Sequence, residues 1–190
     1  YNYGAFCCFD EDRYTVQAGD TLRVQAYRIG TQEVTDGGSG PLKATDELDV
    51  AVYDADWTQV EDAVEKTEGG YSVRLNRPGT YYLLGVDPNK ETKEACLAPA
   101  TATVTVEEAK PEMTRTDSGV QIRYPLEQAR GTLYAAAYRG GRLVALEAQP
   151  VTAAGVQKVV LKCTQEYDTV RLFWLDEKSL PLMTPFTGTP

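Results

Sequence analysis

Hydrophobic and polar residues alternate along most of this chain with the two-residue period of a half-buried β-strand. In the first half the alternation runs from Tyr14 to Tyr27 across a Gly19-Asp20 turn, and it returns at Leu48 to Val52 and at Ala100 to Val106. Helical periodicity is absent from the first of these runs. The pattern therefore predicts strands here, with a strand pair on the two sides of the Gly19-Asp20 turn.

A second strand pair is predicted around the turn Arg77-Pro-Gly79. Its two strands would be Tyr71 to Leu75 and Thr80 to Val86. The segment before it, Val60 to Thr67, has no clear period and is compatible with one helical turn or a loop.

The second half carries the clearest hairpin signal of the chain. Two apolar runs between Leu133 and Leu146 meet at Gly140-Gly141, and glycines at both central positions favour a tight two-residue β-turn. Five strand-like runs with the spacing of a β-sandwich follow one another here: Gly119 to Tyr124, Gly131 to Tyr138, Arg142 to Gln149, Val156 to Lys162 and Thr169 to Leu175. The proline-containing tail from Leu180 to Pro185 is predicted to be an edge strand.

Between the halves, Glu107 to Glu112 is charged, contains Pro111 and has few apolar residues, so it reads as a linker. The boundary is expected near Lys110. The prediction is an all-β protein of two tandem β-sandwich modules, 1–110 and 111–190.

Composition and net charge exclude some classes of binding partner. The 190 residues are 42% hydrophobic, as in proteins with a buried core, and carry a formal net charge of −9. This charge repels phosphate backbones and anionic lipid, so we expect no nucleic-acid partner. No apolar stretch approaches the roughly 18 residues of a membrane span, so we expect no membrane insertion. Because the chain starts with Tyr1 and not Met, we expect a piece of a longer protein.

The chain has no histidine, which excludes nucleophilic catalysis by a Ser-His or Cys-His pair. No phosphate-binding glycine loop is present, and no pair of carboxylates stands out for glycoside hydrolysis. We therefore expect a protein that is not an enzyme and needs no cofactor.

Carboxylates gather in two segments that are incomplete candidates for calcium. One is Asp10-Glu-Asp12, and the other contains Asp54, Asp56, Glu61 and Asp62. Calcium prefers several oxygen ligands, but neither segment has the glycine and distal glutamate of an EF-hand loop. Solvated surface loops are the better interpretation, and we expect no metal site.

Trp57, between Asp56 and Thr58, is the ligand candidate, because an exposed indole beside acidic and hydroxyl groups can support a pyranose ring. Tyr14, Tyr53 and Tyr71 could extend such a platform, or could pack against cross-strand neighbours as strand tyrosines commonly do. Trp174 is expected in the core.

The four cysteines do not match a zinc site, since Cys7 and Cys8 are adjacent and no histidine is available. Two alternatives remain: a disulfide from Cys7 or Cys8 to Cys96, or free thiols. Cys163 lies in the second half.

Two segments resemble known domains. Leu75 to Gly85, with Tyr81 two residues after Gly79, resembles the strand E to strand F corner of bacterial immunoglobulin-like domains, which implies that Tyr81 ties the corner to the backbone. Gly131 to Pro185 resembles the immunoglobulin-like or fibronectin-type-III-like modules of secreted and surface proteins of gut Gram-positive bacteria. The motifs that carry this second likeness are Tyr134-Ala-Ala-Ala-Tyr138, Gly141-Arg-Leu-Val144, Asp168 to Asp176, and Leu180-Pro-Leu182.

The resemblance implies two tandem immunoglobulin-like β-sandwich modules in an extracellular or cell-surface protein. The expected function is a non-catalytic spacer, adhesion or protein-interaction segment, with other domains of the parent protein and a glycan or protein on a cell surface as partners. The alternative is a carbohydrate-binding accessory module of a glycan-active enzyme, with Trp57 in its site.

Overall fold

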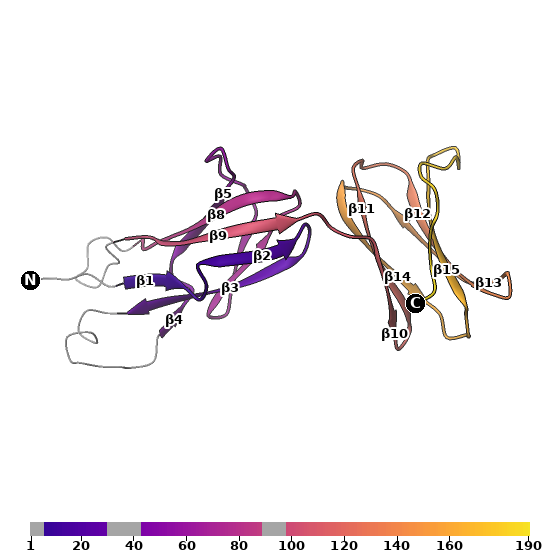
Figure 1. Cartoon of the computed structure of the whole chain (residues 1–190), viewed down its shortest axis with the longest axis horizontal. Coiled ribbons are helices and arrows are strands. Elements are labelled where there is room, and N and C mark those ends of the chain that lie inside the picture. The colour runs from indigo at the N-terminus through magenta and orange to yellow at the C-terminus, as the bar shows by residue number, and fades with distance from the viewer. Residues whose placement is uncertain (1–5, 30–42, 89–97) are drawn as a thin grey trace, which may run out of the picture. The chain divides into compact units, whose positions relative to one another are not determined.

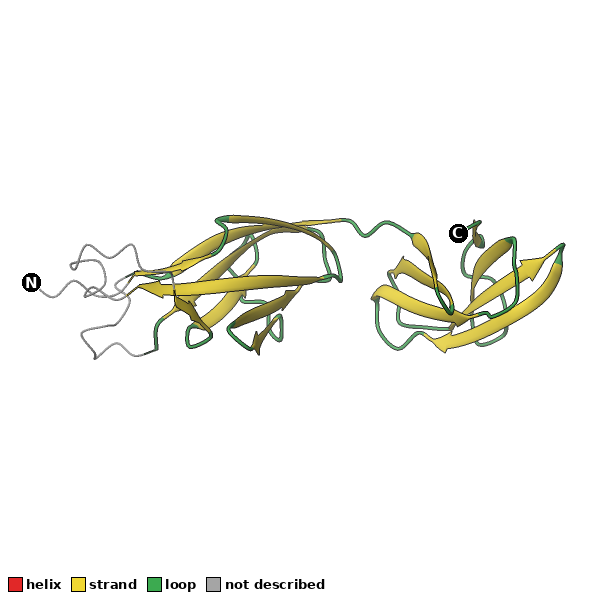
Figure 2. Cartoon of the chain, turned by 90° about the horizontal axis from the view of Figure 1, so that it is seen from below, coloured by secondary structure: helices red, strands yellow, loops and turns green. Residues whose placement is uncertain are grey.

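The computed structural model describes residues 6–29, 43–88 and 98–190, which form strands and turns with no helix among them (Figures 1 and 2). It follows that these residues contain no helix able to cross a membrane. The all-β prediction is confirmed. The chain divides into two compact units, Tyr1–Glu108 and Ala109–Pro190, and the expected boundary near Lys110 lies two residues beyond this division.

The described part of the first unit is built from nine strands in two sheets. One sheet has the order β1-β3-β7-β6 with β4 also paired to β3, and the other has the order β2-β9-β8-β5. The strands are β1 (Phe6–Phe9), β2 (Arg13–Gln17), β3 (Thr21–Ile29), β4 (Lys43–Thr45), β5 (Asp49–Tyr53), β6 (Val64–Thr67), β7 (Gly70–Arg74), β8 (Gly79–Val86) and β9 (Ala100–Glu107).

The two sheets of the first unit enclose a core, because alternate side chains of each strand point inward and are buried. Val24 and Val73 are buried from one sheet, and Leu83 and Val104 from the other. The packing between the sheets is tight at Gly85, where an added Cβ would come within 3.1 Å of the Phe9 ring. A larger residue at position 85 would therefore push the sheets apart, and this arrangement is sandwich-like.

Two predicted strand pairs in this unit are wrong in their pairing, although the strands exist. β2 and β3, on the two sides of the Gly19-Asp20 turn, lie in different sheets: β2 pairs in parallel with β9, whereas β3 pairs with β1, β4 and β7. β7 and β8, around Arg77-Pro-Gly79, are also in different sheets. At both turns the chain crosses the core. Val64–Thr67, predicted as part of a helical turn or loop, is strand β6.

The second unit also has two sheets, of orders β10-β11-β14 and β13-β12-β15-β16. Its core contains Val120 and Leu161 from the first sheet and Leu133 and Leu172 from the second. The strands are β10 (Glu112–Thr116), β11 (Gly119–Leu126), β12 (Thr132–Arg139), β13 (Arg142–Pro150), β14 (Gly155–Lys162), β15 (Thr169–Leu175) and β16 (Phe186–Gly188).

The predicted hairpin in this unit is confirmed. β12 and β13 pair with Arg139 opposite Arg142, and both turn residues have positive φ, 54° at Gly140 and 77° at Gly141, as a type I′ turn requires. The predicted edge strand from Leu180 to Pro185 is wrong. Only an isolated bridge, Leu175 to Pro181, forms there, and the edge strand is the later β16. The two prolines of the tail lack the N–H groups that a longer ladder needs.

Candidate functional site

Trp57 lies at the tip of the loop that follows β5, and its side chain is 63% exposed. The loop is held by one carboxylate: Oδ1 of Asp54 accepts hydrogen bonds from the backbone amides of Asp56 and Thr58, each at 2.9 Å. Trp57 itself has φ of 61°, in the left-handed region that few non-glycine residues occupy. The bonds around it fix this conformation and hold the indole at the surface.

The indole of Trp57 packs on two tyrosines of neighbouring strands. It stacks on the Tyr82 ring with 4.7 Å between centroids and 12° between planes, and it contacts the Tyr53 ring at 6.3 Å and 47°. Tyr53 on β5 and Tyr82 on β8 are direct cross-strand partners. We call Tyr53, Trp57 and Tyr82 the aromatic cluster. Its two tyrosine rings support an indole that is largely exposed.

Polar side chains continue the cluster across the outer face of the same sheet. Thr103 on β9 is the cross-strand partner of Tyr82, and Arg13 on β2 is the partner of Thr103. Their inward-facing neighbours Tyr14 and Val104 are buried, so Thr103 and Arg13 face outward. From Tyr53 to Arg13 the row crosses three strand spacings of about 4.8 Å, or about 14 Å in all. A hydroxyl and a guanidinium thus lie beside the aromatic rings.

Two of the tyrosines suggested for this platform do not belong to it, because both point into the core. Tyr14 is buried, and its hydroxyl donates to Oδ1 of Asp10 at 2.5 Å; burial and this carboxylate raise its pKa. The Tyr71 hydroxyl donates to the carbonyl oxygen of Leu48 at 2.9 Å and accepts from its amide at 2.8 Å. Burial raises the pKa of Tyr71 to about 12.

Sequence reasoning placed Trp57 and Tyr53 in the candidate site but missed Tyr82. The available signal was the register of β5 on β8: pairing the alternating runs Leu48 to Val52 and Thr80 to Val86 would have brought Tyr82 beside Tyr53. The turn at Arg77-Pro-Gly79 instead favours pairing of the strand Thr80 to Val86 with Tyr71 to Leu75, and this pairing hides the register of β8 on β5.

In each of the two calcium candidates, one aspartate accepts hydrogen bonds from backbone amides. Asp54 caps its own loop, and Oδ1 of Asp10 accepts from Tyr14 and from the backbone amide of Gln25. Throughout the described ranges, no three His, Cys, Asp or Glu side chains are grouped so that they could hold a metal ion. Asp56, Glu61 and Asp62 are exposed.

The cysteines divide into bonded and free. Cys7 forms a disulfide, whereas Cys8 is an exposed free thiol and Cys163 is a buried one whose Sγ donates to the carbonyl oxygen of Gln165. Cys96, the partner suggested by the sequence, lies outside the described residues.

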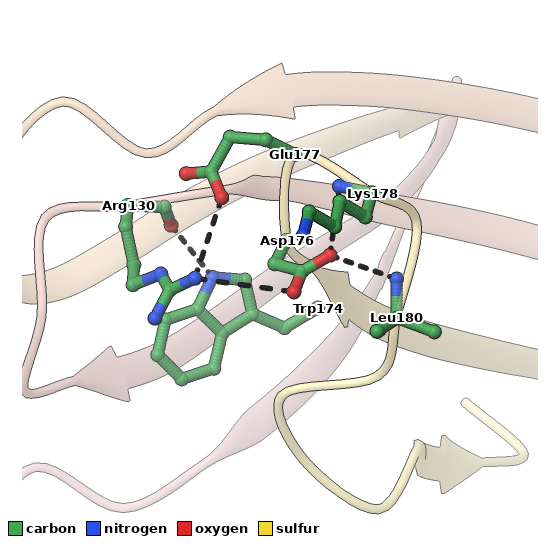
Figure 3. A network of polar contacts seen from close by, with 6 residues as sticks. All are labelled: Arg130, Trp174, Asp176, Glu177, Lys178 and Leu180. Carbon is green, nitrogen blue, oxygen red and sulfur yellow. Dashed lines mark hydrogen bonds and ion pairs between the residues drawn. The ribbon is translucent and has the colours of Figure 1, made fainter.

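The second unit repeats the Trp57 loop at Asp176, a repeat that the sequence did not reveal. Oδ1 of Asp176 accepts from the amides of Lys178 and Leu180, each at 2.9 Å (Figure 3). Ser179 has φ of 62°, close to the 61° of Trp57. In both loops the third residue after the aspartate is the left-handed one. The exposed tip residue is therefore a tryptophan in one unit and a serine in the other.

Trp174 is buried as expected and has no free polar edge. Its Nε1 donates to the carbonyl oxygen of Arg130 at 2.8 Å, and the Arg130 guanidinium lies 3.3 Å from Oε2 of Glu177 (Figure 3). The backbone amide of Glu177 and this guanidinium lower the pKa of the Glu177 carboxyl. The only exposed indole among the two tryptophans is thus Trp57.

Neither a scan against protein-family models nor a search of curated proteins found a match to this chain.

Proposed function

We propose that this chain is a non-catalytic pair of immunoglobulin-like modules that acts as an adhesion or protein-interaction segment of a larger bacterial surface or secreted protein. The observation that carries the proposal is the strand order of the first unit. With β1, β3, β5, β6, β7, β8 and β9 taken as strands A to G, its sheets contain the A-B-E-D and C-F-G orders of immunoglobulin domains, with β4 added beside β3 and β2 added beside β9.

Two further features support this assignment. The Tyr81 hydroxyl donates to the carbonyl oxygen of Arg77 at 2.8 Å, in the manner of a tyrosine corner at the start of strand F. In the second unit, sheets of three and four strands pack over one core, with the order A-B-E in one and C′-C-F-G in the other when β10 is taken as strand A. This order agrees with the fibronectin-type-III-like resemblance of that half.

Surface labelling tests the proposal. Antibodies raised against this chain should label intact source cells or detect the protein in the culture medium. A cytoplasmic marker in the same cells controls for leakage. Signal that appears only after permeabilisation, together with that marker, would contradict an extracellular module.

A second candidate function, carbohydrate binding, is favoured by the aromatic cluster. The stack on Tyr82 keeps the Trp57 ring in place without burying it, and Thr103 and Arg13 supply hydrogen-bond donors on the same face. Such a face suits a pyranose ring, which offers C–H groups to an aromatic plane and hydroxyls to its surroundings.

Tryptophan fluorescence tests this candidate, because Trp57 is exposed while Trp174 is buried. Saturable quenching in the wild type, together with a saturable rise in melting temperature with a soluble polysaccharide that is lost in Trp57→Ala and kept in Leu180→Ala, would support it. Leu180 is a matched control because it is similarly exposed but lies in the second unit. An unchanged response in Trp57→Ala would contradict it.

A further inference from the structure

The outer face of the sheet β13-β12-β15-β16 is unusually apolar for a surface. Leu143 and Leu146 on edge strand β13 are 53% and 55% exposed. They are the cross-strand partners of Tyr138 and Ala136 on β12, whose inward-facing neighbours Ala135 and Ala137 belong to the core. Two large aliphatic side chains therefore lie together on the outside of this sheet.

Arginine gives this face its charge. Arg171 on β15 is the cross-strand partner of Ala136, is exposed, and lies with its Cζ 5.4 Å from the centroid of the Tyr138 ring. Arg142 is exposed at the hairpin end of the same face. Tyrosine and arginine are among the residue types enriched where protein interfaces derive most of their binding energy. We call Tyr138, Leu143, Leu146 and Arg171 the arginine–leucine face.

The chain itself carries a surface of the opposite character. Residues 1–108 contain 9 Lys and Arg against 20 Asp and Glu, a formal charge of −11, whereas residues 109–190 contain 10 against 8, or +2. In the first unit the largest exposed aromatic side chain, Trp57, lies in a loop beside exposed Asp56, and exposed Glu61 and Asp62 follow the loop in sequence. An indole next to the Asp56 carboxylate, in a unit of strongly negative charge, complements an apolar face that carries guanidinium groups.

We propose that copies of this chain associate head to tail, with the Trp57 loop of one copy bound to the arginine–leucine face of the next. The indole would pack against Leu143 and Leu146, and the Asp56 carboxylate beside it would face Arg171. Because the two surfaces differ, the contact is heterologous, and a pair of copies leaves one surface of each kind free for a further copy. Repetition of the contact gives open filaments or closed rings of copies.

This inference goes beyond the proposed function, because a module pair can be a spacer or bind a host partner whether or not its copies associate. It also assigns Trp57 a protein partner where the carbohydrate candidate assigns it a sugar. The experiment below uses purified protein without glycan, so it separates these two occupants.

Sedimentation velocity of the full chain over a concentration series is the test. The weight-average mass of the wild type should rise with concentration, and the rise should shrink at high salt because the charges are exposed. Trp57→Ala and Arg171→Glu should each weaken association at least tenfold, as should Leu146→Asp. Lys162→Glu, the same charge change on exposed β14, should behave like the wild type.

A 1:1 mixture of the Arg171→Glu and Trp57→Ala variants gives the most decisive test. Arg171→Glu keeps an intact Trp57 loop and Trp57→Ala keeps an intact arginine–leucine face, so the mixture should form dimers and nothing larger. Thermal melts of each variant check that it is folded. A wild type that stays monomeric up to millimolar concentration would overturn the proposal. So would variants that associate like the wild type, or a mixture that contains only monomers.

Discussion

The hydroxyl of Tyr81, near the start of β8, donates a hydrogen bond to the carbonyl oxygen of Arg77 four residues earlier, at 2.8 Å. The bond spans the turn in which the chain leaves β7 in one sheet and enters β8 in the other. This bond fixes the corner between the sheets. The pKa of Tyr81 is raised, mainly because the phenol is buried.

Removing this hydroxyl should weaken the first unit. Tyr81→Phe leaves the ring in the core but deletes the bond, and we expect a loss of about 1 kcal/mol in the free energy of unfolding. Urea denaturation measures it. Tyr53→Phe is the control, since the half-buried Tyr53 hydroxyl has no hydrogen bond to any other described residue. Equal stability of the two variants would show that the corner bond contributes nothing.

The strands of this protein were largely predictable from sequence, whereas several of their partners were not. Alternation shows that one face of a strand is buried, but in a sandwich the strands of both sheets point at the same core and carry the same pattern. Gly140-Gly141 was read correctly because two glycines with positive φ specify a tight hairpin. Gly19-Asp20 and Arg77-Pro-Gly79 are turns of a different kind, at which the chain crosses between sheets.

Because strand partners are hard to predict from sequence, only part of the candidate site could be predicted. Trp57 was recognised from its polar neighbours, and it is exposed. Tyr82 comes from a strand 25 residues later and needs the register of β8 on β5. Tyr14 and Tyr71 resemble Tyr53 in sequence context but fall on the inward phase of their strands.

Tyr71 should make stability depend on alkaline pH. Its pKa is about 12 in the folded protein and about 10 in an unfolded chain, so its contribution is complete below pH 10 and is lost as the pH rises toward 12. At pH 7, Tyr71→Phe should cost about 2 kcal/mol, because the amide and carbonyl of Leu48 lose a buried partner. Urea denaturation at pH 7 and 11 should show the two proteins converging; a gap that widens at pH 11 would contradict this.

The disulfide of Cys7 can be tested by titrating the free thiols and by measuring the stability lost on reduction. If Cys96 is its partner, thiol titration of denatured, unreduced protein should find two reactive groups, Cys8 and Cys163, and four would exclude the bond. The bond would close a loop of about ninety residues, so reduction should lower stability by about 2–4 kcal/mol. Cys163→Ser, in the other unit, should leave that loss unchanged.

Calcium should not affect the melting temperature. Oδ1 of Asp54 is already engaged by two backbone amides, so a calcium ion that took this oxygen would break the bonds of the Trp57 loop. Chelator or millimolar calcium should leave the thermal midpoint unchanged, while Asp54→Ala should lower stability by about 1 kcal/mol through loss of the loop bonds. A rise of several degrees with calcium would redirect attention to Asp56, Glu61 and Asp62.

The most direct test of two separate modules is to express residues 1–108 and 109–190 separately and compare their amide NMR spectra with that of the whole chain. Each unit has its own two sheets and its own core, so each fragment should give dispersed peaks that match the whole chain except near the 107–112 linker. Collapsed spectra from either fragment would show that the units fold only together, and would contradict the account of two modules.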